Sequence, residues 1–539
     1  MDIMVQCKVC LIIIASAFLF SCIDCVYVQT RDGWVRGRIT SEAIAFLGIP
    51  YASPPRRWEY ARPARPWSGR IWDATRVRPM CIQEPCAASD PPGVCLRQMS
   101  EDCLYLNVYV PPDAEPGGNK SVLVFIHGGG FKSYTGNAQL FNGERLANKG
   151  DVILVTINYR LGALGFLVTG TTRVGATGNY AIADQRLALT WVRRNINRFG
   201  GNPDSVTIFG QSAGAISVGI HLTSHKADNL FSQAIMQSVP FSIRFKTINQ
   251  AIEQGRQFAA NLNCSLSDIY CLRRRSPMEI IDAQKRTTIS FGFLQRFLLW
   301  GPHLDGNEVP IDLIPGFETG IFYNKPVIIG NTADEGIGYI YGAFRNQLSR
   351  NAFAAILMAA MPRYASEIFS RYYPRRVSDA RNEFAELATD FVFICPCRRA
   401  AKSLMQYTNV WMYVFDHNLN FLNETKYFPF CINRACHGSE LPYLFQTAHR
   451  GGFDLSFEDM QLSDEMLIYW TNFAKFGNPN GDQSVVNGEP PPEPRWPRYR
   501  IGQGQLFPSM VFRQPQSTIE NEYHGVVCEA LDRTRYMSN

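Results

Sequence analysis

The sequence lacks the charge runs that mark a nucleic-acid-binding chain. It has no block of five or six like charges, and its densest basic run is the arginine triplet at residues 273–275. A basic run this short is usually a solvated face. The formal net charge of +6 is also small for a chain of 539 residues. We therefore expect no nucleic-acid partner.

Hydrophobic runs long enough to span a bilayer are missing as well. The N-terminal apolar run covers residues 11–20 after Lys8, which matches the core of a signal peptide and is too short for a membrane span. An N-terminal membrane anchor is the alternative. We expect residues 1–25 to be a signal peptide cleaved between Ser21 and Cys25. The C-terminus has neither a hydrophobic tail nor a KDEL-like signal, so we predict a secreted, extracellular protein without a membrane anchor.

The cysteines and glycosylation sequons agree with export. Of fifteen cysteines, four lie in or beside the leader and eleven in the mature chain, where an oxidising compartment favours disulfides over metal sites. Three N-x-S/T sequons lie at Asn119, Asn263 and Asn423. Because eleven is odd, at least one cysteine stays free or bonds to another chain. We find no metal-ligand cluster in the sequence.

Short β-branched runs that alternate with helical stretches indicate the fold class. Residues 122–126 and 152–157 are too short for helices and too apolar for exposed strands, so they predict buried strands. Residues 179–197 have helical spacing. Further strands are expected at residues 206–209, 327–329 and 410–415. The alternation predicts an α/β fold with a large, mostly parallel central sheet flanked by helices, and residues 26–539 as a single domain with long insertions.

The motif G-Q-S-A-G at residues 210–214 follows a predicted strand and opens a predicted helix. A serine hydroxyl is a poor nucleophile and must stand exposed, which a sharp strand-to-helix turn achieves. Glycines two positions away on either side let neighbouring backbone approach closely. A glycine-rich turn with a capping serine is the alternative. The strand–turn–helix context favours Ser212 as a nucleophile.

The motif H-G-G-G at residues 127–130 directly follows another predicted strand. Acyl transfer places negative charge on the substrate oxygen, and free backbone N–H groups stabilise that charge. A phosphate-binding loop is the alternative, but no G-K-[S/T] or dinucleotide motif follows. We expect the N–H groups of Gly129, Gly130 and Ala213 to form an oxyanion hole.

The acid and the base of such a site follow the serine in the order serine, acid, histidine. The D-E-G motif at residues 334–336 comes just after a predicted strand, and sequence order leaves Asp334 and Glu335 as alternatives. Of the eight histidines, His437 and His524 remain as candidates for the base, each followed by glycine. The loop context and the position after the acid candidate favour His437.

From residue 28 to about residue 528 the chain resembles the type-B carboxylesterase and cholinesterase family. The resemblance rests on residues 46–52, 100–107, 201–204 and 211–215. It implies an α/β-hydrolase fold with Ser212 as nucleophile, Glu335 as acid and His437 as general base. It also implies disulfides Cys81–Cys103 and Cys264–Cys271, and a third, Cys395–Cys528, for which Cys397 competes. Two local pairs outside the resemblance are candidates: Cys431 with Cys436, beside the base, and Cys86 with Cys95.

Two departures from the cholinesterase pattern bear on the substrate. Residues 82–102 contain no tryptophan to stack on a quaternary ammonium group, and Gln211 stands where that pattern has glutamate. A choline-ester specialist is therefore disfavoured. The apolar and aromatic stretch at residues 293–300 resembles the acyl-pocket region only loosely, and ordinary core packing is the alternative.

We predict a secreted serine hydrolase that splits a small-molecule carboxylic ester through an acyl-enzyme and needs no cofactor or metal. Three alternatives use the same fold. They are a specialised lipid or hormone esterase, a cholinesterase, and a non-catalytic adhesion protein similar to the neuroligins.

Overall fold

The computed structural model describes residues 5–7, 25–86, 93–94, 96, 98–172, 174–288, 293–362, 365–373, 378–418, 428–452, 454–482, 492–502 and 504–533. Most of the expected signal peptide, the sequon at Asn423 and Cys95 lie outside these residues.

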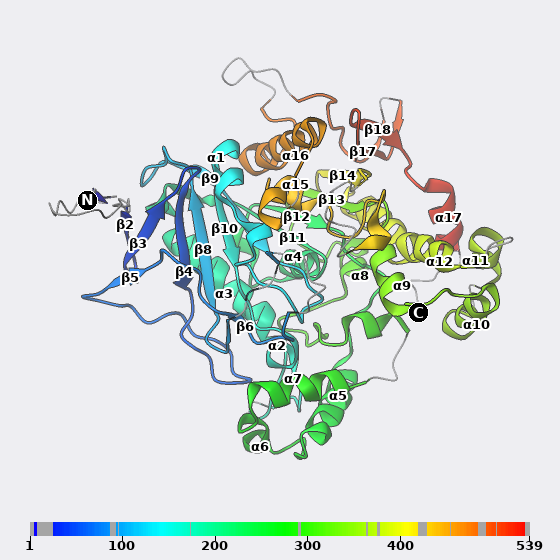
Figure 1. The fold of residues 1–539 in the computed structure, drawn as a ribbon, viewed down its shortest axis with the longest axis horizontal. Helices are drawn as coiled ribbons and strands as arrows, with labels where there is room; N and C mark the ends of the chain where they lie inside the picture. Colours follow the sequence, from blue (N-terminus) through cyan, green and yellow to red (C-terminus); the bar gives the residue numbers. More distant parts are fainter. Residues whose placement is uncertain are drawn as a thin grey trace, which may run out of the picture.

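Fourteen strands of the described residues form one sheet, in the order β1-β2-β3-β4-β8-β10-β9-β11-β12-β13-β14-β17-β18, with β5 beside β3. The centre of the sheet, from β10 to β17, is parallel, and antiparallel pairs flank it on both sides. Figure 1 shows β2 to β5 at one edge and β17 and β18 at the other.

The strands are β1 Val5–Cys7, β2 Cys25–Thr30, β3 Gly33–Ile39, β4 Ile44–Pro50, β5 Ile71–Asp73, β6 Met80–Cys81, β7 Met99–Ser100, β8 Tyr105–Val110, β9 Lys120–Ile126, β10 Ile153–Ile157, β11 Gly201–Gln211, β12 Gln233–Gln237, β13 Val327–Thr332, β14 Val410–Phe415, β15 Ile501–Gly502, β16 Gln505–Leu506, β17 Pro508–Phe512 and β18 Thr518–Asn521.

The α-helices are α1 Glu144–Gly150, α2 Gly162–Phe166, α3 Tyr180–Asn195, α4 Ala213–Thr223, α5 Ile248–Asn261, α6 Ile269–Arg273, α7 Pro277–Arg286, α8 Leu313–Glu318, α9 Ile337–Ala343, α10 Arg350–Ala360, α11 Ala365–Tyr372, α12 Arg381–Ala388, α13 Cys395–Leu404, α15 Leu441–Leu444, α16 Phe457–Phe476 and α17 Gly525–Arg533. No helix of the described residues is both long enough and apolar enough to cross a bilayer.

Both faces of the central sheet are buried, which explains why its strands are apolar throughout. Along β9, Val124 and Ile126 join a core that includes side chains of α3 and α4, whereas Leu123 and Phe125 join a core with side chains of α1 and α16. Successive side chains of a strand point to opposite faces, so a strand covered on both sides has no polar face. The predicted fold class is confirmed: a large, mostly parallel sheet lies between helices (Figure 1).

Four disulfides connect the described residues: Cys81–Cys103, Cys264–Cys271, Cys395–Cys528 and Cys431–Cys436. All three pairs implied by the family resemblance are present, and so is the candidate pair Cys431–Cys436. The competition for Cys528 is resolved, because Cys395 bonds to it and Cys397 is a buried free thiol. The candidate pair of Cys86 includes Cys95, which lies outside the described residues.

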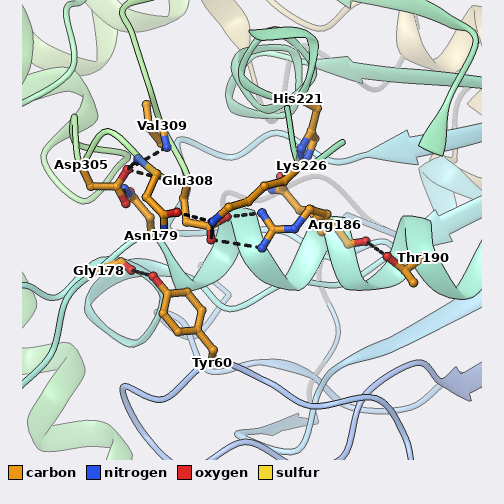
Figure 2. A network of polar contacts seen from close by, with 12 residues as sticks. Tyr60, Gly178, Asn179, Arg186, Thr190, His221, Lys226, Asp305, Glu308 and Val309 are labelled. Carbon is orange, nitrogen blue, oxygen red and sulfur yellow. Dashed lines mark hydrogen bonds and ion pairs between the residues drawn. The ribbon is translucent and has the colours of Figure 1, made fainter. Parts of the chain in front are cut away.

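A polar network fixes the loop at residues 305–309 to α3 (Figure 2). The carboxylate of Glu308 accepts from Arg186 Nη2 at 3.1 Å and from Lys226 Nζ at 2.8 Å. One carboxylate oxygen of Asp305 accepts the backbone N–H groups of residues 307–309 at 2.8 to 2.9 Å. Charged groups thus hold an otherwise irregular segment against the helix.

A second charge pair is buried more deeply, between Arg160 after β10 and Asp184 on α3. Two hydrogen bonds of 2.7 Å join the guanidinium to the carboxylate, and the side chains are 6% and 0% exposed. Arg160 also donates to the carbonyl of Glu59 at 2.7 Å. The pair therefore links the N-terminal part of the chain to a helix that covers the sheet.

We expect Asp184→Asn to lower the free energy of unfolding by about 3–5 kcal/mol, because it leaves a buried guanidinium without its charge partner. The exposed pair Arg193–Asp204 provides the control. Asp204→Asn should cost less than about 1 kcal/mol, since water screens an exposed pair. Chemical denaturation of both variants tests this, and equal losses would contradict it.

Candidate active site

Ser212 lies at the sharp turn between β11 and α4. Its backbone has φ 58° and ψ −122°, in the positive-φ half of the Ramachandran map that a residue with a side chain rarely adopts. A Cβ atom on Gly214 would overlap the carbonyl oxygen of Ile126, the last residue of β9. Only glycine fits there, because the end of β9 lies directly against the turn.

The glycine loop that follows β9 lies beside Ser212. A Cβ atom on Gly128 would lie 3.2 Å from the Cβ atom of Ser212. Gly129 and Gly130 have φ of 91° and 60°, and the carbonyl of Gly129 accepts the N–H groups of residues 132 and 133 at 3.0 Å each. The loop is thus a closed turn that requires positive φ.

Three backbone N–H groups around the serine remain available. Those of Gly129 and Gly130 form no hydrogen bond within the part of the chain that the structure describes. Ala213 is the first residue of α4, so its N–H has no acceptor inside the helix. The helix N-terminus also favours negative charge at this point. The arrangement can bind an oxyanion.

Glu335 comes three residues after β13, and its side chain contacts His437. The carboxylate is 0% exposed, accepts the N–H of Thr332 at 2.9 Å through Oε1, and pairs with Nδ1 of His437 through Oε2. The carboxylate therefore holds the imidazole with its proton on Nδ1 and its lone pair on Nε2.

The neighbouring acid, Asp334, has a different task. Its carboxylate accepts from Arg434 at 3.2 Å and from the N–H of Ala435 at 3.1 Å, and its own N–H donates to the Ala435 carbonyl at 2.9 Å. These bonds and the Cys431–Cys436 disulfide fix the segment that ends at His437. The structure thus brings Glu335, not Asp334, to the imidazole. The rival histidine, His524, pairs with Asp390 at 2.6 Å.

The second nitrogen of His437 faces Gln211 rather than the serine. Nε2 of His437 lies 3.0 Å from the amide nitrogen of Gln211, and Ser212 and His437 share no direct hydrogen bond among the described residues. Gln211 immediately precedes Ser212, so the imidazole is already at the serine turn.

Aromatic side chains surround the imidazole. The rings of Tyr339 on α9 and Phe393 lie 5.4 Å and 5.3 Å from the His437 ring. Burial raises the pKa of the Tyr339 phenol well above its usual value, the charge of Glu335 raises it further, and a side-chain hydrogen bond with Ser212 partly offsets these shifts. Neither ring was expected from the sequence, because no motif marks them.

The stretch at residues 293–300 is expected either to line an acyl pocket or to pack in the core, and different residues of it do different things. Phe297 lies 6.2 Å from the Tyr339 ring, which places it next to the aromatic wall of the site. Trp300 packs against Phe258 at 5.3 Å and is buried in the core. One end of the stretch therefore borders the site and the other is ordinary packing.

Glu440 is a second buried carboxyl near the base, and sequence reasoning missed it. It is 0% exposed and accepts from Nε2 of Gln237 at 3.0 Å. Burial raises the pKa of its carboxyl to about 7, and the charge of Glu335 adds to the shift. Its place three residues after His437 is the only signal that the sequence offers.

The geometry agrees with the comparison to known proteins. The family described as the Carboxylesterase family matches residues 24–526. The chain belongs to the carboxylesterase family. Its fold is that of a solved PNB esterase, which is 31% identical, with a TM-score of 0.77 over 94% of this chain and 99% of that one.

Curated relatives of this chain carry different names. The Crystal protein of Dictyostelium discoideum is 36% identical over 86% of this chain and 84% of its own. An acetylcholinesterase of Danio rerio is 33% identical over 88% of this chain and 83% of its own. Neuroligin-2 of Mus musculus is 32% identical over 84% of this chain and 60% of its own. Family membership supports an esterase function, and the specific activity is inferred below from the geometry of the site.

The raised pKa of Glu440 predicts how stability depends on pH. The folded state holds the Glu440 proton more tightly than the unfolded chain, whose pKa is near 4.5. The stability that the protonated Glu440 contributes is therefore fully present below about pH 4.5 and is lost as the pH rises through 7. We expect Glu440→Gln to abolish this loss, which is on the order of 3 kcal/mol.

Chemical denaturation at pH 4.5, 6 and 8 measures this difference. The gain in stability of the variant over the wild type should grow between pH 4.5 and 7 and then level off. A gain that is the same at every pH would contradict the prediction.

Proposed function

We propose that this carboxylesterase family member is a serine carboxylic-ester hydrolase with Ser212 as nucleophile, His437 as general base and Glu335 as the acid. The observation that carries the proposal is the buried contact between Glu335 and His437, beside a strained serine turn. The available N–H groups of Gly129, Gly130 and Ala213 support it further.

The reaction proceeds in two steps through an acyl-enzyme. His437 takes the proton of Ser212 as the hydroxyl oxygen attacks the ester carbonyl, and Glu335 stabilises the imidazolium that forms. The oxyanion hole of Gly129, Gly130 and Ala213 stabilises the tetrahedral intermediate. The alkoxide leaves with the proton from His437. Water then repeats the attack and releases the carboxylic acid.

The residues around the site favour an uncharged ester. Glu335 and Glu440, the carboxylates next to the imidazole, are both 0% exposed and so offer no surface to a cation. Position 211, beside the nucleophile, carries a neutral amide, and no tryptophan occurs at residues 82–102. The rings of Tyr339 and Phe393 provide an apolar wall. We infer a small-molecule ester with apolar substituents as substrate, which includes lipid and hormone esters.

The similarity to neuroligin-2 raises a second candidate, a non-catalytic adhesion protein. An adhesion surface does not need a buried carboxylate oriented on an imidazole next to a strained serine. That combination costs stability and serves proton transfer, so it favours the enzyme. We further propose that the chain is exported after cleavage of residues 1–25 and glycosylated at the sequons, which the four disulfides support.

A fluorophosphonate probe tests the nucleophile. The probe should label the purified protein, and Ser212→Ala should abolish labelling because it removes the proposed nucleophile. Glu335→Gln should slow labelling by about 10³- to 10⁴-fold, since it leaves the imidazole in the wrong tautomer.

Asp334→Asn is the matched control for the acid. It should reduce the labelling rate by less than about tenfold, because Asp334 fixes the base loop without orienting the proton. Absence of labelling in correctly folded wild-type protein would support the adhesion protein instead.

Paired esters that differ only in charge test the substrate class. A neutral ester should be hydrolysed with a kcat/KM at least about tenfold higher than its choline analogue of equal shape, because residues 82–102 hold no tryptophan whose cation–π contact, worth up to ~2 kcal/mol, would offset the desolvation of the cation. Equal kcat/KM values, or a preference for the choline ester, would refute this assignment.

A further inference from the structure

Gln211 contacts three segments of the site at once. The side chain is at the end of β11, next to the nucleophile, and its residue is 5% exposed. Its amide nitrogen lies 3.0 Å from His437 Nε2 in the base loop. A Cβ atom on Gly128 would lie 2.9 Å from its amide oxygen, and one on Gly438 would lie 3.5 Å from its amide nitrogen. The glycine loop and the base loop therefore leave the amide little room to move.

The chemistry of the imidazole determines the direction of the Gln211 hydrogen bond. Nδ1 of His437 faces the Glu335 carboxylate, which has no proton to give when ionised, so Nδ1 carries the proton. Nε2 then carries a lone pair and accepts from the amide N–H of Gln211. The same lone pair must accept the proton of Ser212 in the acylation step. Gln211 and Ser212 thus compete for one atom.

We propose that Gln211 is a positioning residue that holds the neutral imidazole in the resting enzyme and gives up Nε2 to Ser212 when acylation begins. The inference rests on the proposed function and adds a step to it. The hydrogen bond from Gln211 to Nε2 breaks and the Ser212 proton moves to Nε2. The serine oxygen bonds to the carbonyl carbon as the electron pair of the C=O π bond moves to the carbonyl oxygen. The proton later leaves with the alkoxide.

Replacement of the neutral amide changes which form of the imidazole is favoured. A glutamate at position 211 would accept a hydrogen bond from Nε2–H of the imidazolium and stabilise the charged form. A methionine has similar length and neither donates nor stabilises charge. The other titratable groups around the imidazole are Glu335, Glu440 and Tyr339, and all three are unchanged in both variants.

The test follows the second-order rate of fluorophosphonate labelling, and kcat/KM for a neutral ester, from pH 5 to 9. In Gln211→Glu the acidic limb of both profiles should shift to higher pH by about one to three units. In Gln211→Met the limb should shift in the same direction by less than one unit. The plateau rate of the methionine variant should rise about two- to tenfold, because no hydrogen bond to Nε2 has to break.

The control is Gln185→Met on α3, which removes another buried amide. Gln185 bonds Ser217 at 3.0 Å and His221 at 3.1 Å, away from the triad. This variant should leave the acidic limb where it is in the wild type.

The results separate failure of this inference from failure of the proposed function. Suppose that the wild type is labelled at Ser212 but the acidic limb of the pH–rate profile of both Gln211 variants lies where it does in the wild type. The inference about Gln211 is then overturned, and the proposed esterase function is retained. If the wild type is not labelled, both the inference about Gln211 and the proposed function are overturned. If Gln211→Met does not fold, as circular dichroism would reveal, the shift in Gln211→Glu decides the question alone.

Discussion

The rest of the site depends on the close approach of the end of β9 to the turn at Ser212. Gly214 has no room for a side chain because the Ile126 carbonyl occupies that space, and Gly128 lies against the serine itself. Strand β9 is paired with β11 in parallel, so both strands end at the same edge of the sheet. Strand pairing alone thus brings Ser212, at the end of one strand, beside the free N–H groups that follow the end of the next.

The acid and the base reach the same edge by a longer route. Glu335 follows β13, two strands beyond β11, and His437 follows β14 after a long connection. The order of the strands is enough to bring Glu335 to this edge of the sheet. The position of His437 depends instead on local contacts with Asp334, the Cys431–Cys436 disulfide and the rings of Tyr339 and Phe393. In the proposed triad, the sheet positions Ser212 and Glu335 and a loop positions His437, and Gln211 lies between the serine turn and that loop.

Much of the fold was predictable because buried strands are apolar and short, and the expected strand at residues 410–415 coincides with β14. Strand β11 begins earlier than expected, at Gly201, because its irregular start pairs with Lys120 before a shift of register. The motifs predicted Ser212 as the nucleophile and the glycine loop as the oxyanion hole, whereas the choice of Glu335 over Asp334 needed the family resemblance. Gln211, Tyr339, Phe393 and Glu440 act through contacts between distant segments, which no local pattern encodes.

The structure of the fluorophosphonate adduct tests the account most directly, because it observes the reaction centre itself. We expect the phosphorus on the Ser212 oxygen and the phosphoryl oxygen about 2.7–3.1 Å from the N–H groups of Gly129, Gly130 and Ala213. A phosphoryl oxygen that points away from these three groups, or a phosphorus bound to any other residue, would contradict the account.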